Sequence, residues 1–315
     1  MSAPVANAAA EGTSSRALTS RKGIPIVTKD PVRAFLALTF AISWAIWFAM
    51  IAGSVSIATT TGLISNIVAT AGPSIAAVIL TRVIGGGEIR RLLHGFSPRL
   101  VSPRSALVAL LLPLSMVGIA IAASVALFGS PPPAITLLAT SGLVVEFVRV
   151  LFLGGPLEEE LGWRGFLLPR LQARRPAFDA SVLLGVIWGL WHMPLYFVLG
   201  TGQHQTAAGA GAAVAIIAFV VWTIALSILF TWLFNQTRGS LIVVILFHAS
   251  VNLAAFLPAA LAVAGAATFL YPLATWIVAL IVAARYGREN LAVRSRVRIS
   301  TPSVKRDLRD PRPAR

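Results

Sequence analysis

Long apolar segments, separated by short polar connections, make up most of this chain. A helix needs about 20 residues to cross the apolar part of a bilayer. Runs of about this length lie at 34–53, 63–84, 105–128, 140–169, 180–199, 209–234, 240–257 and 259–283. The pattern therefore predicts an all-α polytopic membrane protein, a bundle of about eight transmembrane helices.

The connections between these runs are of two chemical kinds. One kind is uncharged and rich in Gly, Pro, Ser and Thr, as in GSPPP and GTGQHQTAA, whereas the other is basic, as in RLQARRPAFD and NQTRGS. The two kinds alternate along the chain, and Lys and Arg accumulate in the cytoplasmic loops of membrane proteins. We therefore predict that both termini are cytoplasmic, because an odd number of crossings would place the basic C-terminal tail outside.

Composition agrees with a multi-pass membrane protein. Of the 315 residues, 57% are hydrophobic and 12% are charged, and the mean hydropathy is +0.83. Soluble proteins contain about 25% charged residues. The chain has no cysteine, which excludes disulfides, a thiol nucleophile and cysteine metal ligands.

The same patterns divide the chain into three parts. Residues 1–32 predict a disordered cytosolic tail, residues 33–284 hold the transmembrane helices, and residues 285–315 form a basic cytosolic tail with 10 of the 26 Lys and Arg residues. Such a tail can bind nucleic acid or anionic lipid headgroups. We favour anionic lipid as the partner of the basic tails and expect no nucleic acid.

Polar side chains inside the apolar runs need partners, because a charge at the bilayer centre costs about 2.5–3.5 kcal/mol even on mild insertion scales. Those that cannot reach a connection are Glu146, Arg149, Glu158, Glu159, Glu160, Arg164, His192, His248 and Asn252. We interpret Glu146 and Arg149 as a structural ion pair. Glu158 is interpreted as a solvated residue at the rim of a cavity.

Three pairs have the i,i+4 spacing that places two side chains on one helix face. They are Glu160 with Arg164, Trp188 with His192, and His248 with Asn252. At about 1.5 Å of rise per residue, Glu159, His192 and His248 lie about 13–18 Å from the cytoplasmic boundary, which predicts one shared site. The run that holds Glu159 is too long for one straight span, so its helix either tilts strongly or breaks at Gly154-Gly155-Pro156.

A buried carboxylate beside imidazoles can activate water. Pairing of Arg164 with Glu160 leaves Glu159 as the general base. Glu159, His192 and His248 match the two-histidine, one-carboxylate set of a catalytic zinc. The same histidines can instead orient water and an oxyanion without metal, with the Asn252 amide as a further donor. No HExxH motif is present, so both alternatives stay open.

Other designs of intramembrane hydrolase do not fit this sequence. No Asp lies in any of the predicted spans, which excludes an aspartyl dyad, and no GxSxG motif marks a serine nucleophile. The set of glutamates and histidines is what remains.

The three clusters together resemble the CPBP family, which comprises the type II CAAX prenyl endopeptidases and bacteriocin-processing or immunity proteins. Its signature reads EExxxR, FxxxH and HxxxN on successive helices. Here the motifs run from Glu159 to Arg164, from Trp188 to His192 and from His248 to Asn252, and Trp188 replaces the Phe. The resemblance covers about residues 63–257.

The resemblance implies roles for these residues. Glu159 and His192 would activate the water, and His248 and Asn252 would stabilise the oxyanion. The supporting residues would be Glu160, Arg164 and Trp188. The family is described both as metalloproteases and as metal-independent glutamate proteases, so the cofactor stays open.

The activity implied is that of an intramembrane endopeptidase that cuts a membrane-associated protein or peptide near the cytoplasmic leaflet. Known eukaryotic members cut a prenylated C-terminal tripeptide. For this chain we expect a bacterial plasma-membrane protein with another substrate. The alternative is a non-proteolytic membrane scaffold or immunity protein that retains the same cavity.

Overall fold

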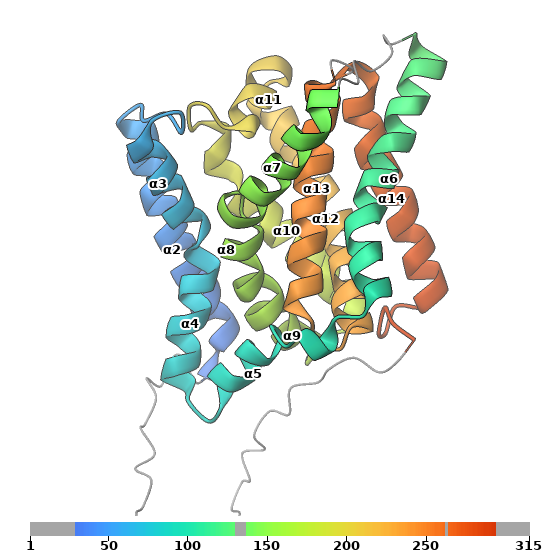
Figure 1. Cartoon of the computed structure of the whole chain (residues 1–315). Coiled ribbons are helices and arrows are strands. Elements are labelled where there is room, and N and C mark those ends of the chain that lie inside the picture. Colours follow the sequence, from blue (N-terminus) through green and yellow to red (C-terminus); the bar gives the residue numbers. More distant parts are fainter. Residues whose placement is uncertain (1–28, 130–136, 262–263, 294–315) are drawn as a thin grey trace, which may run out of the picture.

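The computed structural model describes residues 29–129, 137–261 and 264–293, and this part of the chain is helical without strands (Figure 1). The helices are α2 (Pro31–Ala52), α3 (Thr60–Thr70), α4 (Gly72–Ile84), α5 (Glu88–His94), α6 (Pro103–Phe128), α7 (Leu137–Leu153), α8 (Pro156–Glu160), α9 (Leu168–Gln172), α10 (Ala177–Trp191), α11 (Gly202–Ala210), α12 (Ala212–Gln236), α13 (Leu241–Ala260) and α14 (Ala264–Tyr286). Two short 3₁₀-helices, η1 (Pro98–Leu100) and η3 (Met193–Tyr196), and a π-helix, η2 (Leu161–Leu167), complete the list. The predicted all-α class is confirmed.

Five of the described helices, α2, α6, α12, α13 and α14, are long and apolar enough to cross a membrane. The bent pair α3 and α4, with an angle of 44° between its members, adds a sixth crossing if it forms one broken span. The remaining predicted spans, 140–169 and 180–199, are occupied by the broken run α7–α9 and by the short apolar helix α10. The chain is a multi-pass membrane protein, while the number eight and the cytoplasmic termini stay predictions.

The helices pack around a central group that consists of α8, η2, α10, α12 and α13. Helices α2 to α4 lie on one side of this group and α6 and α14 on the other (Figure 1). Large apolar side chains are exposed on the outer helices, for example Ile119 on α6 and Phe269 on α14. Lipid tails can cover such side chains, so the outer helices separate the central group from the bilayer.

The long run that holds the three glutamates breaks at Gly154 and Gly155, as one of the two sequence alternatives predicted. Gly155 adopts a φ of 107°, a conformation that glycine tolerates best. Pro156 then opens α8, and the Glu158 carboxylate accepts a hydrogen bond of 3.2 Å from the Gly155 backbone N–H. Glu158, expected at a solvated rim, is therefore a half-buried helix cap.

The π-helix η2 follows α8 directly and changes the register of the chain between Glu160 and α9. Its Gly162 lies against α4, since an added Cβ atom would come within 2.4 Å of the Pro73 carbonyl carbon. This close approach fixes η2 against the α2–α4 side of the bundle. Single π-turns inside helices are common at functional sites.

The chain beyond α14 packs against the bundle before the described part ends. Leu291 is buried, the Phe178 N–H donates to the Arg288 carbonyl oxygen at 3.0 Å, and the Asn235 amide donates to the Asn290 carbonyl oxygen at 2.7 Å. The beginning of the predicted C-terminal tail is thus ordered against α10 and α12. The rest of that tail, 294–315, and most of the N-terminal tail, 1–28, lie outside the described residues.

The topology can be tested with single cysteines, because the chain has none of its own. Gln205 on α11 and Arg99 in η1, which follows α5, are both exposed, and α11 and α5 lie at opposite ends of the bundle (Figure 1). We expect a membrane-impermeant maleimide to label Gln205→Cys in intact cells and Arg99→Cys only after the membrane is opened. Labelling of Arg99→Cys in intact cells would contradict cytoplasmic basic connections.

Candidate active site

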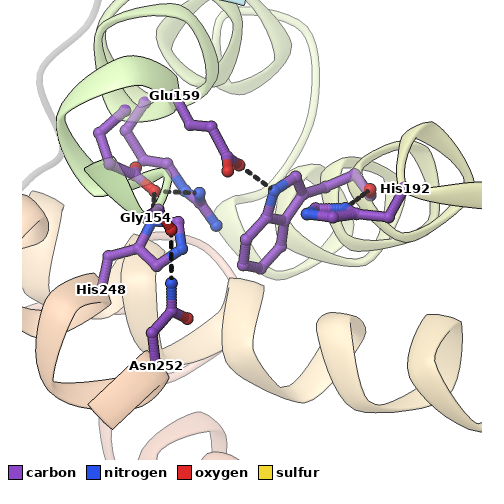
Figure 2. Close-up of polar contacts among 8 residues, drawn as sticks. Gly154, Glu159, His192, His248 and Asn252 are labelled. Carbon is purple, nitrogen blue, oxygen red and sulfur yellow. Dashed lines mark hydrogen bonds and ion pairs between the residues drawn. The ribbon is translucent and has the colours of Figure 1, made fainter. Parts of the chain in front are cut away.

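Five ionisable side chains from three separate stretches of sequence meet inside the central group of helices. They come from α8 and η2, from the end of α10, and from the middle of α13, and they are Glu159, Glu160, Arg164, His192 and His248 (Figure 2). All five are buried, and the exposed fraction is 3% for Glu159 and 0% for Glu160 and Arg164. The sequence expectation of one shared site agrees with this placement.

Glu159 is held by an indole rather than by a cation. The Trp188 Nε1–H donates to Glu159 Oε2 at 2.7 Å. On its other side Glu159 lies against the helix break, because a Cβ atom added to Gly155 would come within 2.4 Å of Glu159 Oε1. An indole N–H can only donate, so it fixes the carboxylate without protonating it.

Glu160 is the partner of two other members of the group. Its Oε1 accepts hydrogen bonds from Arg164 Nη1 and from His248 Nδ1, both at 2.7 Å. The i,i+4 pair of Glu160 and Arg164 was predicted from the sequence, whereas the contact with His248 was not. Glu160 thus links the helix of the glutamates to α13.

The Arg164 guanidinium lies between aromatic rings. Its Cζ atom is 4.5 Å from the centre of the Trp188 ring and 3.8 Å from the centre of the Phe230 ring. Among the residues that the structure describes, Arg164 Nε and Nη2 are buried without a hydrogen-bond partner, and the guanidinium packs against the two rings instead. Cation–π contacts of this kind stabilise a desolvated guanidinium by about 2 kcal/mol.

Each histidine is oriented through its Nδ1 atom. His192 Nδ1 lies 2.7 Å from the Trp188 carbonyl oxygen, and a carbonyl oxygen accepts only, so Nδ1 carries the hydrogen and Nε2 keeps its lone pair. His248 Nδ1 donates to Glu160 in the same way. The Trp188 ring packs edge to face against both imidazoles, with centroid distances of 5.6 Å to His192 and 5.4 Å to His248.

Asn252 ties α13 to the helix break. Its Nδ2 donates to the Gly154 carbonyl oxygen at 3.0 Å (Figure 2). That carbonyl would otherwise lack a helical partner, because the chain leaves α7 at this point. One amide hydrogen of Asn252 is therefore engaged in holding the helix break.

The three residues proposed for zinc do not form a metal site as they are placed. Across the residues that the structure describes, no group of three His, Asp or Glu side chains has the arrangement to hold a metal ion. One carboxylate oxygen of Glu159 accepts instead from the Trp188 indole N–H. Glu159, His192 and His248 thus lie in one cluster, but not in an arrangement that would hold a metal ion.

Several aromatic residues around the histidines were not identified from the sequence. His192 packs edge to face against Trp191, with 4.7 Å between ring centroids, and against Phe219, at 5.0 Å. Phe230 packs against His248 at 5.4 Å. Trp191 could have been identified because it directly precedes His192 in the sequence. Phe219 and Phe230 lie on α12, in an apolar run without a polar motif to mark them.

Comparison with known proteins matches the region of this site. The family model for "Type II CAAX prenyl endopeptidase Rce1-like" matches residues 140–254, which include every residue of the candidate site. The protein named CAAX prenyl protease 2 from Methanococcus maripaludis is 30% identical over 237 residues, which cover 71% of this chain and 83% of that protein.

Proposed function

Because the chain belongs to the type II CAAX prenyl endopeptidase family, we propose that it hydrolyses a peptide bond of a membrane-associated protein or peptide near the cytoplasmic leaflet of the plasma membrane. The observation that carries the proposal is the placement of Glu159. This carboxylate is buried and makes no ion pair with Arg164. It accepts a hydrogen bond from the Trp188 indole, and the same indole ring packs against both histidines. It is the carboxylate of the site that is free to take a proton.

In this mechanism Glu159 removes a proton from a water molecule as the water oxygen attacks the substrate carbonyl carbon. The C–O bond forms, and the carbonyl becomes a tetrahedral oxyanion. The C–N bond then breaks, and the proton passes from Glu159 to the leaving amine. His192 Nε2, which keeps its lone pair, accepts a hydrogen bond from the same water and holds it in line.

His248 and Asn252 are the proposed donors to the oxyanion. Asn252 offers its second amide hydrogen. A neutral imidazole has one N–H, and that of His248 is on Nδ1 and donates to Glu160. His248 can therefore donate through Nε2 only as an imidazolium. The Glu160 carboxylate stabilises that positive charge, much as a buried carboxylate stabilises the imidazolium of a serine-protease triad.

A membrane scaffold without proteolysis is the second candidate. The observation in its favour is that His248 and Asn252 both hold α13 to the broken run, through Glu160 and Gly154. A scaffold would need these two contacts but would not need a carboxylate without an ion-pair partner. Glu159 therefore distinguishes the two functions.

The test is a comparison of cell membranes that contain either the protein or Glu159→Gln at equal abundance. New protein termini are identified by mass spectrometry after labelling of free amines. We expect a new C-terminus and its matching new N-terminus only with the unchanged protein. If the two membranes give the same termini, the protease proposal fails and the scaffold is favoured.

The Trp188 indole should affect catalysis through Glu159. Trp188→Phe removes the donor but keeps a ring against both histidines, and a hydrogen bond to a charged group contributes about 1.5–3 kcal/mol. We expect kcat for an identified substrate to fall at least about tenfold. Trp191→Phe is the matched control, because Trp191 is also buried beside His192 but its Nε1 has no hydrogen-bond partner in the described part of the chain. Equal losses in both variants would assign Trp188 a packing role only.

A further inference from the structure

A cavity lined by several charged side chains lies apart from the candidate active site. It has a volume of about 90 Å³ and is bounded by the end of α4, by α5, by η2 and α9, and by the turn between α12 and α13. None of the five ionisable residues of the active site lines it. Helices α5 and α9 lie at one end of the bundle, opposite α11 (Figure 1). This is the end that carries the basic connections.

The walls of this cavity carry excess positive charge. Arg91, Arg170 and Arg238 line it together with a single acidic residue, Glu88. Glu88 pairs with both Arg91 and Arg170, and the Arg170 Nη2 to Glu88 Oε2 distance is 2.6 Å. Arg238 makes no ion pair with any residue that the structure describes. Three arginines and one glutamate leave two positive charges for an outside anion to neutralise.

These charges are held in place by ordered structure. Arg170 is only 11% exposed, donates to the Phe166 carbonyl oxygen at 2.8 Å, and stacks 3.5 Å from the centre of the Phe166 ring. The turn that carries Arg238 is tied to α5, because the Leu241 N–H donates to the Gly95 carbonyl oxygen at 2.7 Å. The cavity is therefore formed before an anion arrives.

Thr81 and His94 also line the cavity, and apolar side chains form much of the rest of its wall. Leu92, Phe234 and Leu241 line its inner part. Leu93 on α5 is 54% exposed next to it. A free inorganic anion would gain nothing from these side chains, whereas a lipid brings a phosphate and an acyl chain together. Basic pockets between helices at the cytoplasmic surface suit such headgroups.

We propose that this cavity binds the phosphodiester headgroup of an anionic phospholipid, with Arg238 and Arg170 on the phosphate and the acyl chain along α5. The inference does not rest on the proposed protease activity. It differs from general attraction of lipid to the basic tails, because it assigns the binding to particular residues of the folded domain.

The test uses the purified full-length protein in detergent, with phosphatidylglycerol and phosphatidylcholine as competing probes and retained lipid measured by native mass spectrometry. We expect phosphatidylglycerol to be preferred. Arg238→Gln should weaken its retention about fivefold, the effect of one surface charge. Arg90→Gln is the matched control, because Arg90 is also exposed on this end but does not line the cavity, and it should leave retention within about twofold.

Two results would overturn the proposal. Equal losses in Arg238→Gln and Arg90→Gln would show that general surface charge attracts the lipid. Displacement of phosphatidylglycerol by excess inorganic phosphate would show a site for free phosphate rather than for lipid. The melting temperature of each variant in detergent is measured alongside. If Arg238→Gln has unfolded, Arg238→Ala takes its place, and a folded Arg238→Lys, which keeps the charge, should retain the lipid about as well as the unchanged protein.

Discussion

Glu159→Gln is expected to lower the rate of peptide hydrolysis by about 10²- to 10⁴-fold, the contribution typical of a positioned general base. Glutamine has the same shape and its carbonyl oxygen can still accept the Trp188 indole hydrogen bond. It cannot take a proton from water. Because Glu159 makes no ion pair with Arg164, the exchange also leaves no buried cation unpaired. The loss should therefore fall on kcat, with the melting temperature nearly unchanged.

Glu158→Gln is the control for this variant. Glu158 is the adjacent carboxylate in the same helix turn, but it caps the Gly155 N–H and is half-buried. Glutamine keeps an oxygen for the cap, so we expect less than about a threefold change in rate. Kinetics on one reconstituted substrate check both variants. Full activity of a folded Glu159→Gln protein would remove Glu159 from the mechanism.

The helical part of the fold was accessible from the sequence because a chain in lipid must satisfy its backbone hydrogen bonds within each span. An apolar run long enough to span the membrane therefore predicts a helix, and helices occupy the predicted runs. The exact course of the run with Glu159 was less accessible. Its break at Gly154 was one of two alternatives, and the π-helix η2 depends on how closely Gly162 approaches Pro73 on α4.

Within one helix, spacing predicted two ion pairs, whereas His248 and Asn252 bond to different partners, Glu160 and Gly154. Glu160 with Arg164, and Glu146 with Arg149, are ion pairs as expected. Between helices, the position of a residue along its helix gives its depth in the membrane but not the direction in which its side chain points. The sequence could therefore place His248 at the depth of the glutamates without showing which glutamate it contacts. The bond from His248 to Glu160 and the bond from Trp188 to Glu159 depend on the rotation of α13 and α10 about their axes.

The zinc alternative stayed open at the sequence level for the same reason, because the rotation of the helices was not known. Residue types alone make two histidines and a glutamate a plausible ligand set. Whether three ligands converge on one metal ion depends on the directions of their side chains, which a sequence motif does not contain. In the structure the aromatic ring of Trp188 contacts both imidazoles and its N–H takes one oxygen of Glu159. The residue that departs from the family pattern is thus the residue that contacts all three.

Arg164→Met should be the most destabilising single change in this group. The Glu160 carboxylate would stay buried without its cation, and removal of one partner of a buried ion pair costs about 3–5 kcal/mol. Glu160→Gln combined with Arg164→Met should recover much of that loss, because no buried charge remains unpaired while an oxygen is kept for His248. Thermal unfolding in detergent measures both, and the coupling between the two changes follows from the double-mutant cycle.

The ion pair of Glu146 and Arg149 on α7 is the control for Arg164→Met. Arg149 is 52% exposed and pairs with Glu146 three residues earlier, so Arg149→Met removes an ion pair that the protein does not enclose, and we expect it to cost less than Arg164→Met. If Arg164→Met costs no more than Arg149→Met, then Arg164 is not needed to compensate Glu160. His248, which bonds to Glu160 Oε1 at 2.7 Å, would then be the group that balances this carboxylate, and Arg164 would have only a packing role between the Trp188 and Phe230 rings.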